Sequence, residues 1–155
     1  MVTSSLFASL QMPQPLACEF FAVFSRFEFA LKECGHFYLH RGHASPDWRT
    51  FATTIAETLH VTPESDLYEA INFLNTEPPQ VQVSARDWRP VALFGTTPIA
   101  TAIDAAQRVR HNLFHGGKHS PHSPPERDER LVRAALTVLM ACLAHDAALS
   151  AAYAQ

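Results

Sequence analysis

Apolar residues that recur at three- and four-residue intervals are the feature that most restricts the fold of this chain. In the first such segment the recurring residues are Leu16, Phe20, Val23, Phe24, Phe27, Leu31 and Cys34. That spacing puts them on one side of an α-helix. Gly35, a residue type common just past a helix end, follows the last of them. The sequence therefore predicts an amphipathic helix that ends at Gly35.

Four further helices are predicted from start signals in which a capping residue precedes proline. The signals are Ser-Pro-Asp at 45–47, Thr-Pro-Glu at 62–64, Thr-Pro at 97–98 and Ser-Pro-Pro-Glu at 123–126. Apolar residues at helical spacing follow each signal. The first three of these helices are expected to reach Leu59, Leu74 before Pro78-Pro79, and Phe114 before Gly116-Gly117.

The stretch from 77 to 95 lacks helical spacing. It contains three prolines, a glycine and only a short alternation around Val81 and Val83, so we predict an ordered loop and assign no strand. The predicted fold class is therefore all-α, a bundle of about five helices. We expect a flexible N-terminus over residues 1–13 and a single helical domain over residues 14–155.

Composition excludes several classes of protein. A chain of 155 residues with 47% hydrophobic content can bury a core without metal or disulfide support. Its three cysteines are widely spaced and form no CxxC pair, and a net charge of −3 does not suit a protein that coats nucleic acid indiscriminately. With no leader and no apolar run of roughly 18 residues, we expect a cytoplasmic protein without a membrane segment.

Two features predict a homodimer. Between residues 134 and 144 the last helix is apolar nearly all round, because Leu136, Met140 and Leu143 lie opposite its main apolar face. Such a helix is either central in the bundle or shared with a second subunit. Phe29 adds to the second option, since it lies opposite the apolar stripe of the first helix.

Reactive side chains are concentrated in one run, Arg-Val-Arg-His-Asn-Leu-Phe-His-Gly-Gly-Lys at 108–118. On an ideal helical wheel Arg110 falls in the middle of the apolar face, whereas Arg108 falls on the opposite, solvated side. A guanidinium among apolar neighbours is costly unless it is paired or lines a site. Arg110 is therefore either a site residue or the partner of an acid, for which Glu28 of the first helix is available.

His115 lies five residues after Arg110, about 140° away on an ideal wheel. An unwound last turn before the two glycines, a π-type turn or a composite site across a dimer would bring the pair together. If they meet at an RNA phosphate, the imidazole can move a proton while the guanidinium holds two phosphate oxygens. Asn112 could orient the phosphate or the 2′-hydroxyl. The products would be a 2′,3′-cyclic phosphate and a 5′-hydroxyl.

Metal binding is the competing interpretation of the histidines. His111 and His115 are four apart, a spacing that can begin a zinc site, and His119 and His122 follow. No HExxH, nearby acid or suitably spaced cysteine completes such a site, so no metal or other cofactor is predicted. A second group of histidines, whose spacing is equally weak, is expected to cap helices or face solvent: His36, His40 and His43.

The Arg110-His-Asn-Leu-Phe-His115 segment, followed by Gly-Gly-Lys, resembles the HEPN superfamily, whose signature is an arginine, four to six residues and a histidine near the end of a late helix. It is similar to the Arg-Asn-Asn-Leu-Phe-His-Gly-Gly-Lys form of bacterial members. Glu28 and Lys32 are similar to the Glu-x3-Lys helix of that superfamily. The resemblance covers about 20 residues. This chain departs from the common form at His111, where asparagine or aspartate is usual, and lacks a tyrosine two residues after His115.

The resemblance implies a dimerising helical bundle and a metal-independent endoribonuclease of the toxin or phage-defence kind, acting on tRNA or mRNA and regulated by a cognate antitoxin. Its catalytic residues would be Arg110 and His115, supported by Asn112 and Glu28. Substrate-binding roles would fall to His111, Lys118 and Lys32. The alternative from the same residues is a non-catalytic helical module that binds a protein partner or a nucleotide.

Overall fold

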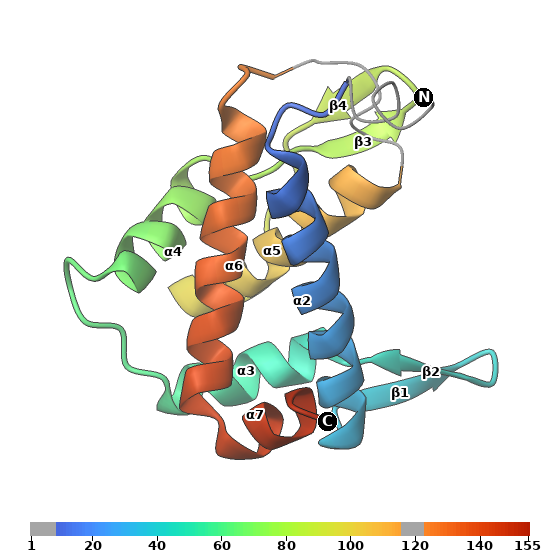
Figure 1. Ribbon diagram of the computed structural model, residues 1–155, viewed down its shortest axis with the longest axis vertical. Helices are drawn as coiled ribbons and strands as arrows, with labels where there is room; N and C mark the ends of the chain where they lie inside the picture. Colours follow the sequence, from blue (N-terminus) through green and yellow to red (C-terminus); the bar gives the residue numbers. More distant parts are fainter. Residues whose placement is uncertain (1–8, 116–122) are drawn as a thin grey trace.

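The computed structural model describes residues 9–115 and 123–155 of the chain. The elements in this part, in chain order, are α2 (Gln14–Glu33), β1 (Phe37–His40), β2 (His43–Pro46), α3 (Trp48–Thr58), α4 (Asp66–Thr76), β3 (Val81–Ser84), β4 (Asp87–Arg89), α5 (Pro98–Phe114), α6 (Arg127–His145) and α7 (Ala147–Tyr153) (Figure 1). Most of the predicted N-terminal segment 1–13 and the predicted helix stop at Gly116-Gly117 lie outside the described residues.

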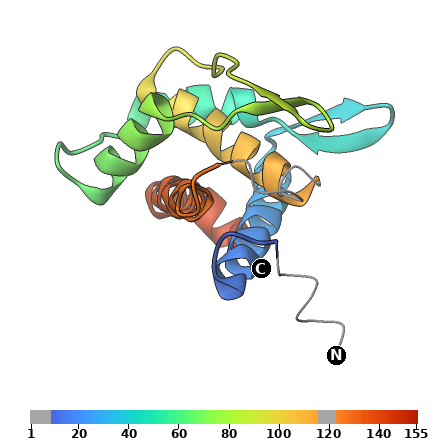
Figure 2. The same ribbon diagram turned by 90° about the horizontal axis from the view of Figure 1, so that it is seen from above.

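Two helices, α5 and α6, form the centre of the fold. α5 packs against α3, α4 and α6, while α6 also contacts α2, α4 and α7. Figure 2 shows α5 crossing α6, with both hairpins on the side of α5 away from α6. Ala102, Ala105 and Ala106 of α5 are completely buried, and such small side chains let neighbouring helices approach closely. Of the two options for the apolar last helix, a central position accounts for most of its surface, although Met140 stays exposed.

The first predicted helix is confirmed. α2 begins at Gln14, and its stripe from Leu16 to Leu31 is buried. Gly35 follows with φ +83, the left-handed conformation that favours glycine. The stripe is largely aromatic: Phe27 stacks on Trp48 of α3 with ring centroids 5.2 Å apart and meets Phe51 edge to face at 5.6 Å. These rings join α2 to α3.

The predicted starts of α3 and α4 are wrong in detail. Asp47, rather than Ser45, caps α3, and its carboxylate accepts hydrogen bonds from the Thr50 backbone N–H at 3.0 Å and from the Thr50 hydroxyl at 2.7 Å. Ser65, rather than the Thr-Pro-Glu at 62–64, caps α4. In both places several capping residues stand close together, and the sequence signal does not distinguish them. The start of α5 at Thr97 is confirmed.

The prediction of an all-α fold without strands is wrong, because residues 9–115 and 123–155 are mostly helical and also form two antiparallel hairpins. The first pairs β1 with β2 and projects from the helices (Figure 1). Arg41 and Gly42 make its turn, both with positive φ. Two consecutive positive φ values are typical of a two-residue hairpin turn, for which Asn-Gly is the familiar sequence signal. Arg-Gly lacks that signal, and the prediction missed the hairpin.

The second hairpin lies within the predicted loop at 77–95. β3 and β4 pair antiparallel, with an irregularity between Gln82 and Ser84. The short alternation around Val81 and Val83 therefore belonged to a strand. Strands of four and three residues carry too little periodicity to be separated from loop by sequence.

The predicted last helix is α6, and a short helix that was not predicted, α7, follows it. α6 ends at His145 and α7 leaves it at an angle of 111°. Asp146 lies at the break and ends α6 while its carboxylate caps α7, accepting a hydrogen bond from the Leu149 N–H at 3.0 Å. Within the described residues, no single helix has the length and apolar composition needed to cross a membrane; α6 and α7 meet those criteria only as this bent pair.

Replacing Asp146 tests the cap. Asp146→Ala should lower the free energy of unfolding by about 1 kcal/mol, because the first turn of α7 loses its acceptor. Asp146→Asn, which keeps an acceptor oxygen, should cost less, and Ser150→Ala on the exposed side of α7 should change little. Chemical denaturation measures all three. Equal stability of Asp146→Ala and the unaltered protein would contradict a capping role.

Candidate functional site

The C-terminal end of α5 carries the predicted site residues. The helix continues to Phe114, and His115 forms its C-cap with φ −104 and ψ 30. The His115 N–H still donates to the His111 carbonyl at 3.0 Å, so the last turn keeps ordinary α-helical bonding. A π-type turn is therefore not the device that ends this helix.

Arg110 and His115 meet within one chain. Arg110 Nη1 lies 2.9 Å from His115 Nε2. The separation of the two residues on an ideal wheel is overcome without a second subunit, because the long arginine side chain reaches across the last turn to the C-cap residue. Neither the unwound last turn nor the π-type turn considered from sequence is needed to bring the pair together.

This contact sets the roles of the two groups. A guanidinium has only donors, so Arg110 donates and Nε2 accepts, which corresponds to the tautomer with its proton on Nδ1. The lone pair that a catalytic base would use is therefore occupied by Arg110.

A surface cavity of about 350 Å³ opens beside this pair. Arg110 and Glu28 both line it, and the Arg110 guanidinium lies 5.6 Å from the centre of the Phe24 ring, a cation–π distance. Glu28 accepts a hydrogen bond from Trp48 Nε1 at 3.2 Å. Among the ion pairs of the described residues none joins Glu28 to Arg110, so the suggested pairing of these two is wrong. The structure does place both at one cavity.

His111 lines the same cavity, and its ring stacks on His115 with centroids 4.5 Å apart. Its pKa is lowered below the ordinary histidine value of 6.5, first by partial burial and then by the positive charges that His115 and Arg110 can place beside it. The lowered pKa favours the neutral form of His111 at physiological pH.

The placement of Arg108 in solvent is wrong. Its side chain is only 13% exposed and pairs with Asp104 at 3.4 Å. The guanidinium also donates to three carbonyl oxygens, those of Pro79 at 3.2 Å, Val91 at 2.7 Å and Ala92 at 3.1 Å. Pro79 precedes β3 and the other two follow β4, so one arginine holds both ends of the second hairpin on α5.

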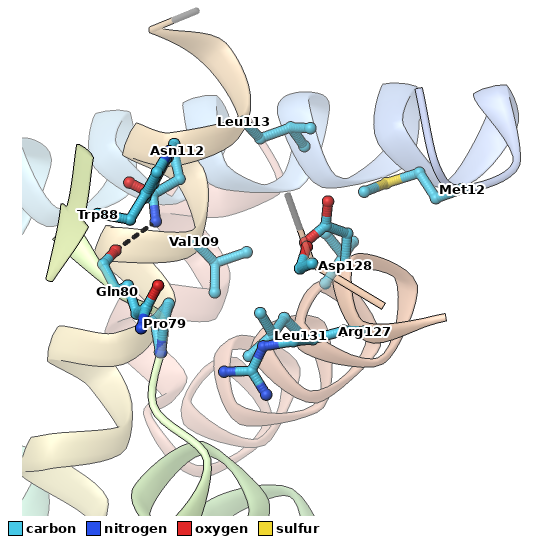
Figure 3. A pocket seen from close by; sticks show the side chains of 12 residues that line it. Met12, Pro79, Gln80, Trp88, Val109, Asn112, Leu113, Arg127, Asp128 and Leu131 are labelled. Atoms are coloured by element: carbon cyan, nitrogen blue, oxygen red, sulfur yellow. Dashed lines mark hydrogen bonds between the residues drawn. The ribbon is translucent and has the colours of Figure 1, made fainter. Parts of the chain in front are cut away.

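Asn112 is not brought to the Arg110 cavity. It is 4% exposed, and its Nδ2 donates to the Gln80 carbonyl at 2.7 Å. Figure 3 shows this bond beside a separate cavity that Arg127 and Asp128 also line. That cavity measures about 30 Å³, room for a water molecule rather than a nucleotide. Asn112 is therefore a second anchor, beside Arg108, that holds the β3–β4 hairpin on α5.

The remaining predicted residues lie apart from the cavity or outside the described chain. Lys32 is half-buried in the last turn of α2 and does not line the cavity. Lys118, His119 and His122 lie outside the described residues. Over residues 9–115 and 123–155, no three side chains of histidine, cysteine, aspartate or glutamate are grouped to hold a metal ion.

The cavity also contains residues that the sequence did not indicate as part of a site. Phe24 and Trp48 line it beneath Arg110 and beside Glu28. Phe24 was recognised as a core residue of α2, and its place one turn before Glu28 was the available signal. Trp48 offered none, because its neighbours in the cavity come from other helices.

Comparisons of this chain with protein family models, with curated proteins and with solved structures find no match. A functional assignment depends on the chemistry of the residues at this helix end.

The pKa of His111 can be measured directly. We expect its ring to titrate below pH 6.5 in NMR spectra. Arg110→Gln should raise this midpoint only part of the way toward 6.5, because burial is a larger cause of the shift than the Arg110 charge. The folded state then binds fewer protons than the unfolded state just below pH 6.5, so the contribution of His111 to stability falls as the pH falls through that window. A midpoint at or above 6.5 would contradict the described environment.

Replacing Arg108 tests its structural role. Arg108→Ala should lower the free energy of unfolding by about 2–3 kcal/mol, because its partners lose a charged donor. Arg108→Lys should recover only part of this, since an ammonium cannot fork toward separate carbonyls. The matched control is Arg86→Ala in the exposed turn of the same hairpin, expected to fall within about 0.5 kcal/mol of the unaltered protein. Similar losses for Arg108→Ala and Arg86→Ala would exclude the anchoring role.

Proposed function

We propose that this protein is a metal-independent endoribonuclease of the HEPN kind, with Arg110 and His115 as its catalytic residues. The observation that supports the proposal most is the 2.9 Å approach of Arg110 Nη1 to His115 Nε2 at the end of α5. It joins a permanent cation that lines an open cavity to an imidazole, the two groups that phosphodiester cleavage by the neighbouring 2′-hydroxyl requires.

Substrate binding would switch this pair from its resting arrangement. Hydrogen bonds from a guanidinium to a phosphate are charge-assisted and stronger than one to a neutral imidazole. An RNA phosphate entering the cavity would therefore draw Arg110 away from His115 and free the Nε2 lone pair. The base becomes available only when a phosphate is present to be attacked.

The reaction then proceeds as a transesterification. His115 Nε2 takes the proton of the 2′-hydroxyl, the 2′-oxygen forms a bond to phosphorus, and the bond to the 5′-oxygen breaks. Arg110 stabilises the charge that builds on the phosphate oxygens. His115 returns the proton to the departing 5′-oxygen, so the products are a 2′,3′-cyclic phosphate and a 5′-hydroxyl. Neutral His111 stacks on His115 and limits its rotation.

The biological setting that we propose follows from the resemblance. The protein acts in the cytoplasm on tRNA or mRNA, as a toxin or a phage-defence nuclease, with a cognate antitoxin as its regulator. We also propose a homodimer, which would bring two such sites to one cleft. Phe29 and Met140, 45% and 48% exposed, are apolar residues available for that contact.

Two substitutions test the function. Arg110→Ala and His115→Ala should each reduce RNA cleavage by about 100-fold or more, the size typical of losing a transition-state cation or a general base. Cleavage by the unaltered protein should persist in EDTA, and the products should carry cyclic phosphate ends. Arg86→Ala and His43→Ala, which remove an exposed arginine and an exposed histidine elsewhere, serve as controls.

Thermal unfolding verifies that all four variants fold. Unreduced cleavage by both Arg110→Ala and His115→Ala would refute the assignment. If the unaltered protein leaves RNA intact, while the same two variants change its association state or its affinity for a nucleotide, the non-catalytic module is the correct interpretation.

A further inference from the structure

Two phenylalanines form an exposed aromatic pair beside the Arg110 site. Phe21 of α2 and Phe114 of α5 meet edge to face with ring centroids 5.3 Å apart, although they are 57% and 36% exposed. Phe114 also stacks on the buried Phe20 at 6.2 Å with an interplanar angle of 23°. Phe114 is thus held by other rings while part of its surface stays open to solvent.

This pair is continuous with the proposed catalytic residues. Phe114 lies four residues after Arg110, on the same side of α5, and directly before His115. The Phe114 ring lies 6.2 Å from the ring of Phe20, which in turn lies 5.8 Å from the ring of Phe24, measured between centroids. The Arg110 guanidinium lies over Phe24. Both views of the fold place this end of α5 beside α2 (Figures 1 and 2).

We propose that Phe114, with Phe21 at its edge, is a stacking platform for an unpaired nucleobase next to the phosphate held by Arg110. The inference rests on the proposed ribonuclease function and names its substrate class, single-stranded RNA. Every base offers a flat π-face, and stacking on aromatic side chains is a principal way in which proteins bind unpaired bases. Bases within a duplex are already stacked on one another and would not be accepted.

The surroundings of the pair suit a base better than a second protein chain. Two rings match the area of one base, whereas a stable protein interface needs about 800 Å² from each partner. The side chains one turn from Phe21 on α2 carry no charge; they are Ala17, Cys18, Phe24 and Ser25. On this part of α2 an apolar base face would meet no ionised side chain, and the phosphate charge is left to Arg110.

The test measures binding of a fluorescein-labelled single-stranded RNA whose 2′-O-methyl groups prevent cleavage. Phe114→Leu keeps an apolar side chain but removes the ring, and should weaken binding by about 5- to 100-fold, the range for loss of one stacked base. Phe21→Leu should weaken it less. The matched control is Tyr68→Leu, which removes a ring 43% exposed on α4, near the N-terminal end of α5. It should bind normally.

An abasic nucleotide moved along the same RNA identifies the stacked base. In the unaltered protein, an abasic nucleotide at one position should weaken RNA binding by the same factor as Phe114→Leu does. Combining that abasic RNA with Phe114→Leu should cause no further loss of affinity. Additive losses, or Phe114→Leu binding as tightly as the unaltered protein, would overturn the platform even where RNA cleavage is observed.

Other outcomes separate this inference from the ribonuclease proposal. If the unaltered protein binds RNA in a way that depends on Phe114 but cleaves none, the nucleobase subsite stands and the ribonuclease proposal is refuted. Absence of RNA binding by the unaltered protein would overturn both. If Phe21→Leu and Phe114→Leu change the sedimentation coefficient of the free protein, the pair is an interface between copies of this chain and the platform is refuted.

Discussion

Close packing around α5 is the constraint on which the rest of the structure depends. Ala102, Ala105 and Ala106 are fully buried, and larger side chains there would force the helices around them apart. With α5 held between α3, α4 and α6, the position of its last turn is determined by the core. From this end of α5, Arg108 and Asn112 anchor the second hairpin, while Arg110 and His111 line the open cavity.

The helices were predictable because apolar spacing and capping chemistry are local properties of the sequence. The stripe of α2, the glycine after it and the Thr97 cap of α5 all follow from residues within one or two turns. The hairpins were not predictable from the same signals, since Arg41-Gly42 is an uncommon turn sequence and β3 and β4 are too short for periodicity. The helix α7 was not predicted, because its seven residues carry too little periodicity to separate it from the helix before it.

The candidate site was predictable in its members more than in its geometry. The motif indicated Arg110 and His115, and the apolar position of Arg110 on the wheel agrees with its place against Phe24. The wheel failed for Arg108, because it assumes that the side of a helix opposite the core faces solvent. Here that side is covered by backbone carbonyls flanking the hairpin, which no pattern in α5 itself could reveal. Asn112 shows the same limit, since its partner is the distant Gln80 carbonyl.

The five-residue separation of Arg110 and His115 has a consequence for how the site comes into being. Contacts between distant segments must overcome the entropy of closing a long loop, whereas a contact inside one helical turn closes almost none. The pair therefore forms once the end of α5 is helical, and it tolerates rearrangements of the core that leave this turn intact. Only the cavity walls from α2 and α3 need the complete tertiary fold. The Arg110–His115 pair and the cavity beside Arg110 are thus encoded at different ranges of the chain, the first locally and the second by assembly.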